Sequence, residues 1–164
     1  MELYKQLVFE RVSEKDVDEL TNIMRCAFDE DTWRHLGKKQ GGPPGYDDGE
    51  FIRQWYIETQ SDAYKISLGG TLIGGVNIFV LRDKERFLGS LFIAPSVQDK
   101  GLGLQVWEFL EQKYPDTQLW QTETPEFSCR NHHFYINKCG FKLIRFEHHQ
   151  GEEHRTMILE KRQD

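Results

Sequence analysis

The chain has 164 residues, 38% of them hydrophobic, so we expect one packed domain over residues 1–164 that needs neither metal nor disulfide support. A formal net charge of -6 argues against nucleic acid as a partner. The 3 cysteines form no CxxC motif, and no segment reaches the roughly 20 apolar residues that span a bilayer. These features favour a cytoplasmic protein without a membrane partner, a disulfide framework or a zinc knuckle.

The first part of the chain predicts a strand followed by a capped helix. Residues 7–12 alternate in polarity, as in a strand with one buried face. Ser13 is followed three positions later by Asp16, which is the spacing of a helix capping box. Apolar residues then recur at helical spacing up to Phe28, near which we expect the helix to end: Val17, Leu20, Met24 and Ala27.

A long loop and a second helix are expected next. Residues 29–48 contain a run of glycines and prolines that can continue neither a helix nor a central strand, so they predict a loop that is functional or mobile. A helix is expected over residues 49–59. Four aromatic residues in this region fit a hydrophobic core or the wall of an acceptor pocket equally well: Trp33, Tyr46, Trp55 and Tyr56.

The middle of the chain predicts a mixed sheet. Residues 64–68, 71–81 and 87–93 are separated by short turns and predict an antiparallel meander. A helix begins at Gly101-Leu102-Gly103, and a strand over residues 118–122 follows it. This strand–helix–strand unit requires a parallel crossover, so the sheet contains both parallel and antiparallel pairs.

The C-terminal part predicts a helix and two more strands. The helix covers residues 128–138 and ends at Gly140, and the strands cover residues 142–146 and 155–159. The predicted order is β-α-α-β-β-β-α-β-α-β-β. It corresponds to an α/β (α+β) sandwich with helices on both faces of the sheet.

The segment with the clearest chemical signal is the turn over residues 97–103, between a strand and a helix. The first backbone N–H groups of a helix have no partner within the helix, and the helix dipole adds positive charge there. Glycine at positions 101 and 103 lets an anion approach the backbone without a Cβ in the way. The turn is therefore a candidate site for a phosphate or pyrophosphate.

The motif Gln98-x-x-Gly101-x-Gly103 resembles the Q/R-x-x-G-x-G/A signature of the GNAT acetyltransferase superfamily. Downstream, Asn131, Phe134-Tyr135 and Cys139-Gly140-Phe141 resemble the closing helix and strand of the same fold. The resemblance is specific over residues 87–146, and the first sixty residues match in layout only. It implies a mixed, mostly antiparallel sheet of about six to seven strands flanked by about four helices.

The resemblance also implies a co-substrate and a reaction. Acetyl-CoA donates its acetyl group to an amine that attacks the thioester directly, with no metal and no protein nucleophile. The strand Leu91, Phe92, Ile93 would pair with the pantetheine arm and offer a backbone N–H to the thioester carbonyl. The other coenzyme contacts implied are Gln98, Asp99, Lys100, Gly101, Leu102, Gly103, Leu104, Asn131 and Lys138.

Tyr135 resembles the tyrosine acid of the family, which protonates the departing thiolate. Four residues separate Tyr135 from Gly140, whereas the commoner family spacing has three. Counted back from Gly140, the tyrosine position would hold Ile136 unless the helix contains a one-residue bulge. The alternative is that Tyr135 is a half-buried aromatic residue of the helix.

The general base is expected among the carboxylates near the acceptor. Glu123 follows the strand at 118–122, where the sheet would open toward the amine. The rival carboxylates are Glu126, Asp31 and Glu50, and an ordered chain of water is a further alternative.

The other polar residues of the C-terminal half favour structural roles. His132 and His133 are expected to pack near the cofactor, and Cys139 is expected to pack before the helix-ending glycine. A cluster in the last turn has no metal-ligand spacing: His148, His149 and His154.

Two functions of different class remain open from the sequence. The first is an N-acetyltransferase acting on a primary amine of a small molecule or a protein. The second is a non-catalytic acyl-CoA sensor or binding module on the same fold. The resemblance further suggests a homodimer formed through the final strands.

Overall fold

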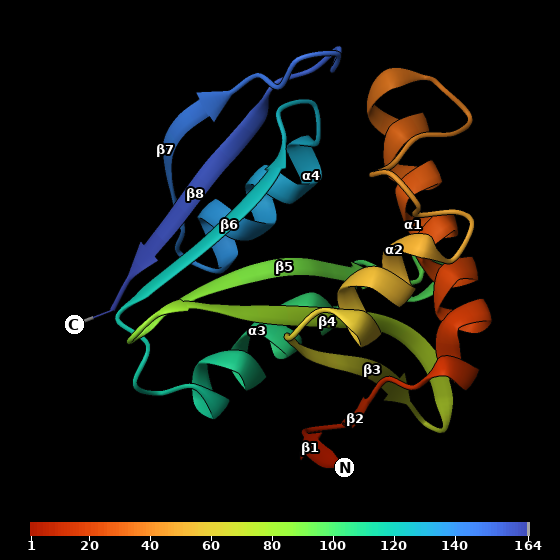
Figure 1. Ribbon diagram of the computed structural model, residues 1–164, viewed down its shortest axis with the longest axis vertical. Coiled ribbons are helices and arrows are strands. Elements are labelled where there is room, and N and C mark those ends of the chain that lie inside the picture. The colour runs from red at the N-terminus through yellow and green to blue at the C-terminus, as the bar shows by residue number, and fades with distance from the viewer. Residues whose placement is uncertain (164) are drawn as a thin grey trace.

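An eight-stranded mixed sheet forms the middle layer of the protein, and helices cover both of its faces (Figure 1). The computed structural model describes residues 1–163. In chain order the strands are β1 Glu2–Tyr4, β2 Leu7–Arg11, β3 Asp62–Leu68, β4 Thr71–Arg82, β5 Glu85–Ile93, β6 Leu119–Pro125, β7 Lys142–Glu147 and β8 Thr156–Arg162. Their spatial order in the sheet is β1-β2-β3-β4-β5-β6-β8-β7. All neighbouring strands are antiparallel except β5 and β6, which are parallel.

The helical segments divide between the two faces. They are η1 Glu14–Asp16, α1 Val17–Leu36, α2 Glu50–Ile52, η2 Arg53–Glu58, η3 Pro95–Val97, α3 Leu102–Lys113, α4 Cys129–His132 and η4 His133–Lys138. Segment α2 continues directly into η2, and α4 continues directly into η4, so each pair is one helix. Both η2 and η4 are π-helical. Helices α1 and α2 lie on one face of the sheet, with α3 and α4 on the other (Figure 1).

Each face has its own hydrophobic core. On the α3 side, the rings of Phe9 and Phe109 stack with centroids 3.8 Å apart, and Trp107 packs edge-on against Trp120. On the α1 side, the helical side chains of Leu20, Met24, Ile52 and Tyr56 pack with Phe92 of the sheet. The predicted mixed sandwich with helices on both faces is therefore confirmed.

The strand count is higher than predicted because of β1. Lys5 has a φ of 52°, and this tight turn folds residues 2–4 back onto β2, with Tyr4 opposite Leu7. The three residues of β1 carry no alternating pattern long enough to mark a strand.

Helix α1 ends at Leu36 and not near Phe28, so the sequence prediction was wrong by two turns. The apolar stripe fades after Phe28, but two side-chain pairs one turn apart continue the helix: Glu30 with Arg34 at 2.9 Å and Asp31 with His35 at 3.2 Å. Gly37 then ends it in the left-handed conformation, with a φ of 69° and its N–H donating to Trp33 O.

The glycine-rich loop that follows is held against α1. Asp29 Oδ1 accepts hydrogen bonds from the Tyr46 hydroxyl at 2.6 Å and from the Gly41 N–H at 3.1 Å. Thr32 Oγ1 donates to Gly41 O at 2.8 Å. These contacts tie the loop to α1 despite its composition. The predicted capping box of Ser13 and Asp16 is confirmed at the other end of the helix.

Strands β5 and β6 diverge part of the way along their length, and this divergence positions the site. They pair from Glu85 opposite Leu119 to Leu88 opposite Thr122. Beyond Leu88 a register shift against β4 leaves Gly89 as an extra residue in β5. The two strands then separate from left to right in Figure 1. No helix within residues 1–163 combines the length and the apolar character that a membrane crossing requires.

Candidate active site

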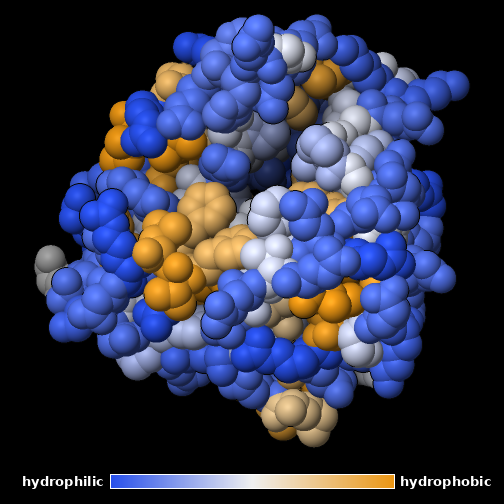
Figure 2. Space-filling view, viewed as in Figure 1, coloured by the Kyte–Doolittle hydropathy of each residue, from blue (hydrophilic) through white to orange (hydrophobic). Residues whose placement is uncertain are grey.

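A cavity of about 220 Å³ lies where β5 and β6 have separated. Its wall combines the end of β5, the 97–103 turn with the start of α3, the α4–η4 segment and one side of α1. Figure 2 shows the surface hollowed between α4 and α1. Apolar rings and backbone groups make up much of this wall, with Arg130 and Lys138 as its cations.

The free edge of β5 forms the floor of the cavity. On one side Leu91, Phe92 and Ile93 pair with β4. On the other side the described sheet gives them no partner, since pairing with β6 stops at Leu88. Gly74 permits the close pairing to β4, because a Cβ there would lie 2.1 Å from Phe92 O. Backbone groups of β5 are thus available to an extended ligand lying in the cleft.

The 97–103 turn presents the start of α3 to the same cavity. Gly101 caps the helix with a φ of 78°, and a Cβ added there would meet no described atom within 4 Å. The first helical hydrogen bond runs from Gln105 N to Gly101 O at 3.2 Å, so the N–H groups of residues 102–104 precede the helical ladder. Open N–H groups at a helix start have the chemistry that an anion site requires. Gly103 has a different role, since a Cβ there would lie 3.2 Å from the Phe134 ring.

Gln98 fixes the turn to the end of β5. Its Nε2 donates to Ile93 O at 2.9 Å, and its Oε1 accepts a hydrogen bond from Arg130 Nη1. Asn131, whose Nδ2 donates to Thr124 Oγ1 at 3.1 Å, and Lys138 lie on the opposite wall. Lys100 is exposed and does not line the cavity.

The one-residue bulge that Tyr135 requires is present. Residues 133–138 form a π-helix in which Cys139 N donates to Phe134 O at 3.0 Å, across five residues. The extra residue is absorbed there, so Tyr135 lines the cavity and Ile136 packs against the core. Burial raises the pKa of Tyr135, and the neighbouring Cys139 adds to the rise while the Thr122 hydroxyl opposes it. The phenol is therefore protonated throughout the neutral range.

Glu123 lies within β6, opposite Ile158 of β8, and not just beyond the strand as expected. Glu123 is exposed as a residue, although neighbouring atoms crowd its carboxyl group, and it does not line the cavity. Partial burial of its carboxyl group raises the pKa of Glu123, and the carboxylates of Glu147 and Glu152 raise it further while His149 opposes them. A carboxyl group with a raised pKa is a better proton acceptor than an ordinary surface carboxylate.

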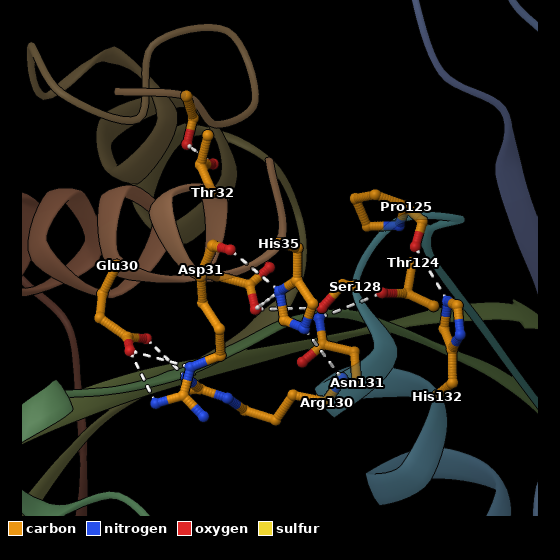
Figure 3. A network of polar contacts seen from close by, with 12 residues as sticks. Glu30, Asp31, Thr32, His35, Thr124, Pro125, Ser128, Arg130, Asn131 and His132 are labelled. Carbon is orange, nitrogen blue, oxygen red and sulfur yellow. Dashed lines mark hydrogen bonds and ion pairs between the residues drawn. The ribbon is translucent and has the colours of Figure 1, made fainter. Parts of the chain in front are cut away.

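The rival carboxylates occupy different surroundings. Glu126 accepts hydrogen bonds from the Arg155 guanidinium, which lower its pKa, and Glu50 is exposed beside Arg53. Asp31 lines the cavity, where its Oδ1 accepts a hydrogen bond from Ser128 Oγ at 3.1 Å and lies 3.2 Å from His35 Nδ1 (Figure 3). Among the four carboxylates, only Asp31 lies on the cavity wall.

The histidines and Cys139 that the sequence singled out have different surroundings. His132 Nε2 lies 3.1 Å from Pro125 O, which is a structural contact, whereas His133 lines the cavity. Cys139 is buried, and this burial raises its pKa to about 12. No group of three or more histidine, cysteine or acidic side chains suited to a metal ion occurs within residues 1–163.

Comparison with known proteins places the chain in a family. Residues 18–141 match the model of the acetyltransferase (GNAT) family. The chain belongs to the GNAT family. It is 31% identical over 149 residues to the uncharacterized protein YrkN of Bacillus subtilis (strain 168), an alignment that covers 89% of this chain and 80% of YrkN.

Solved structures of other GNAT proteins share the fold. The PaiA N-acetyltransferase of Thermoplasma acidophilum, solved with coenzyme A, superposes with a TM-score of 0.69 at 17% identity, covering 96% of this chain and 99% of PaiA. The spermidine N-acetyltransferase of Vibrio cholerae, solved with CoA and spermine, gives a TM-score of 0.69 at 14% identity and covers 96% of both chains. At these identities the likeness establishes the fold.

Within this GNAT site, sequence reasoning assigned Arg130 no role and named Phe134 only as part of a motif. Phe28 was expected at the end of the first helix, and Asp31 was named as a rival base but lies in the second half of α1, which was predicted as loop. Phe134 covers Gly103, and Arg130 bridges the 97–103 turn to α1. The only signal for Arg130 was its position beside Asn131, because its partners are 32 and 100 residues away in the chain.

Proposed function

We propose that the protein is an acetyl-CoA-dependent N-acetyltransferase that acts on a primary amine of a small molecule or peptide. The observation that carries this proposal is the unpaired edge of β5 running directly into the open start of α3. An extended polar chain that ends in a pyrophosphate fits this combination, and the pantetheine arm of CoA has that chemistry. The CoA-bound structures of PaiA and of the spermidine enzyme, which share the fold, support it.

The cofactor contacts follow from the same geometry. The pantetheine arm pairs with Leu91, Phe92 and Ile93, and the pyrophosphate lies on the open amides of the 97–103 turn. A backbone N–H of β5 stabilises the oxyanion that develops on the thioester carbonyl. The residues that bind the coenzyme in this proposal are Gln98, Asp99, Lys100, Gly101, Leu102, Gly103, Leu104, Asn131 and Lys138.

In the proposed reaction the neutral amine nitrogen forms a bond to the acetyl carbon, and the bond from that carbon to the CoA sulfur breaks. Because Glu123 does not line the cavity, it removes the amine proton through water, and its raised pKa favours this role. Tyr135 donates its phenolic proton to the departing thiolate. Holding both substrates in one cavity supplies much of the rate enhancement through proximity.

Carboxylates surround the proposed base. Burial raises the pKa of Glu123, and the charges of Glu147 and Glu152 raise it further while His149 opposes them. This charge favours an acceptor with an ammonium group, as does the formal net charge of -6. GNAT proteins of the same fold include a spermidine N-acetyltransferase and a ribosomal-protein-S18-alanine N-acetyltransferase, so both small amines and peptide amines are tested.

A panel of amines assayed for release of free CoA thiol from acetyl-CoA tests the proposal. We expect thiol release that depends on both the amine and the enzyme, together with a rise in melting temperature when CoA is added. The proposal would be contradicted if no amine in the panel caused thiol release and millimolar CoA did not raise the melting temperature.

A second function is supported by the position of Glu123 outside the cavity wall. If no base reaches the amine, the protein is a non-catalytic acyl-CoA-binding module. The two functions separate cleanly, because the module raises the melting temperature with CoA but releases no thiol with any amine.

We also propose a homodimer formed through β7. This strand is at the edge of the described sheet and exposes three large apolar side chains, Leu143 at 42%, Ile144 at 47% and Phe146 at 41%. Light scattering after size exclusion would give twice the mass of 19.4 kDa. Replacing Ile144 with lysine should return the monomer mass, and a monomeric wild type would contradict the proposal.

A further inference from the structure

Arg130 lies at a junction of the cavity wall that the proposed catalytic roles do not use. It belongs to the first turn of α4, and its side chain is 22% exposed. Its Nη1 donates to Gln98 Oε1, and its Nη2 donates to Glu30 Oε2 at 2.7 Å. One guanidinium therefore joins the 97–103 turn to α1, and Figure 3 shows its Glu30 end.

The Gln98 end of this bridge is oriented. Because Gln98 Nε2 donates to Ile93 O at 2.9 Å, its carbonyl oxygen faces the arginine. The amide group thus connects the last residue of β5, the turn and Arg130 in a single arrangement. A ligand that orders the turn also fixes the acceptor atom to which Arg130 is bound.

The α1 end of the bridge is charged and doubly held. Burial would raise the pKa of Glu30, but hydrogen bonds from Arg130 and Arg34 outweigh it and lower the pKa. Nearby, Ser128 Oγ donates to Asp31 Oδ1 at 3.1 Å, and Arg130 N donates to His35 Nε2 at 3.4 Å. The second half of α1 therefore meets the start of α4 across the gap between β5 and β6, although the two helices cover opposite faces of the sheet.

The third nitrogen of Arg130 takes no part in this bridge. Its Nε–H is buried from solvent and has no hydrogen-bond partner among residues 1–163. Arg130 lines the cavity, so the bridge formed by its two terminal nitrogens is part of the cavity wall.

We infer that Arg130 is a positioning residue that couples acyl-CoA binding at the 97–103 turn to the second half of α1, and through it to the amine side of the site. The inference rests on the proposed CoA site. The coupling operates because CoA binding favours the arrangement in which Gln98 holds Arg130 Nη1, and Glu30, bound to Nη2, then holds α1 in place. The same α1 segment holds Asp29, which anchors the glycine-rich loop.

Hydrogen exchange measured with and without saturating CoA tests this coupling. In the wild type we expect CoA to slow exchange both in residues 98–105 and in residues 29–36 of α1. In Arg130→Met, CoA should still slow exchange in the turn, because its backbone amides remain, but the slowing in α1 should be lost. A side chain that acted only as structural packing would change the exchange of the free protein and not its response to CoA.

Two further variants distinguish loss of the bridge from misfolding of Arg130→Met. Glu30→Gln keeps the turn contact and weakens the α1 contact, so it should also lose the response of α1. Arg34→Met is the matched control, because Arg34 binds the same Glu30 carboxylate but contacts neither Gln98 nor α4, and it should respond as the wild type does.

Each outcome decides the inference. A response of α1 that persists in both Arg130→Met and Glu30→Gln overturns the coupling while the CoA site stands. A wild-type response confined to the turn overturns it as well. The absence of any response in the turn would instead remove the proposed CoA site, and with it the coupling.

Discussion

The protein contains two π-helical segments, η2 over residues 53–58 and η4 over residues 133–138, and each carries a buried tyrosine. Burial raises the pKa of both Tyr56 and Tyr135. The Tyr56 hydroxyl lies 2.7 Å from Ser90 Oγ, which in turn donates to Asn77 Oδ1. That hydroxyl is satisfied inside the protein, whereas Tyr135 lines the cavity. The same π-helical geometry thus serves packing in one place and places a phenol on the cavity wall in the other.

The largest expected effect distinguishes these two tyrosines directly. In Tyr135→Phe we expect kcat to fall about 10²–10⁴-fold, because the thiolate loses its acid, with little change in the KM for acetyl-CoA. The measurement is steady-state thiol release with the amine found by the panel. The defect should shrink with an acyl donor whose leaving group has a lower pKa. An unchanged kcat, with chemistry rate-limiting, would assign Tyr135 to packing alongside Tyr56.

The pH profile of kcat/KM tests whether Glu123 is the general base that works with Tyr135. The base must be unprotonated, and the pKa of Glu123 is raised, so the rate should increase with pH through a value above the ordinary range of a glutamate. In Glu123→Gln this limb should disappear, with kcat/KM lower at all pH values. Glu126→Gln is the control, since that carboxylate is bound by Arg155 and should leave the limb in place. Persistence of the limb in Glu123→Gln would point to another base.

A change in the 97–103 turn tests whether the cavity beside Tyr135 is the coenzyme site. Gly101→Val places a side chain at the open helix start and strains a backbone with a φ of 78°. We expect CoA affinity, measured by calorimetry, to fall by about tenfold or more, since a strained φ costs about 1–3 kcal/mol and the amides are blocked. Gly69→Val is the matched control, as its φ is 58° with no described atom within 4 Å of the added Cβ. It should lose stability and keep CoA affinity.

The smallest effect is expected at Tyr56. Tyr56→Phe removes one hydrogen bond, so the free energy of unfolding should fall by about 0.5–1.5 kcal/mol. For a chain of this size the melting temperature should drop by about 2–4 °C per kcal/mol. The kcat should be unchanged, which is the opposite pattern to Tyr135→Phe. A loss of kcat comparable to that of Tyr135→Phe would give Tyr56 a role in the reaction and contradict the contrast between the two tyrosines.

The elements predicted best are those whose signals are local. The capping box of Ser13, the meander of β3 to β5 and the helix start at Gly101 each depend on residues within a few positions of one another. The end of α1 was missed because its last two turns are stabilised by Glu30–Arg34 and Asp31–His35 pairs rather than by a buried stripe. A polar segment before a glycine-rich run gives a weak periodic signal whether it is helical or not.

The sequence by itself determined the strand–turn–helix with its open helix start, and with the Gln98-x-x-Gly101-x-Gly103 motif it determined the family, because a short motif acts through its own backbone. It also posed the question of the extra residue after Tyr135. Only the tertiary structure decided that the residue is absorbed in a π-helix, since the packing of Ile136 and Phe141 against the core selects which side chain faces the cavity. The contacts of Arg130 were likewise decided by tertiary structure, because they join segments that meet only where two strands of the folded sheet separate.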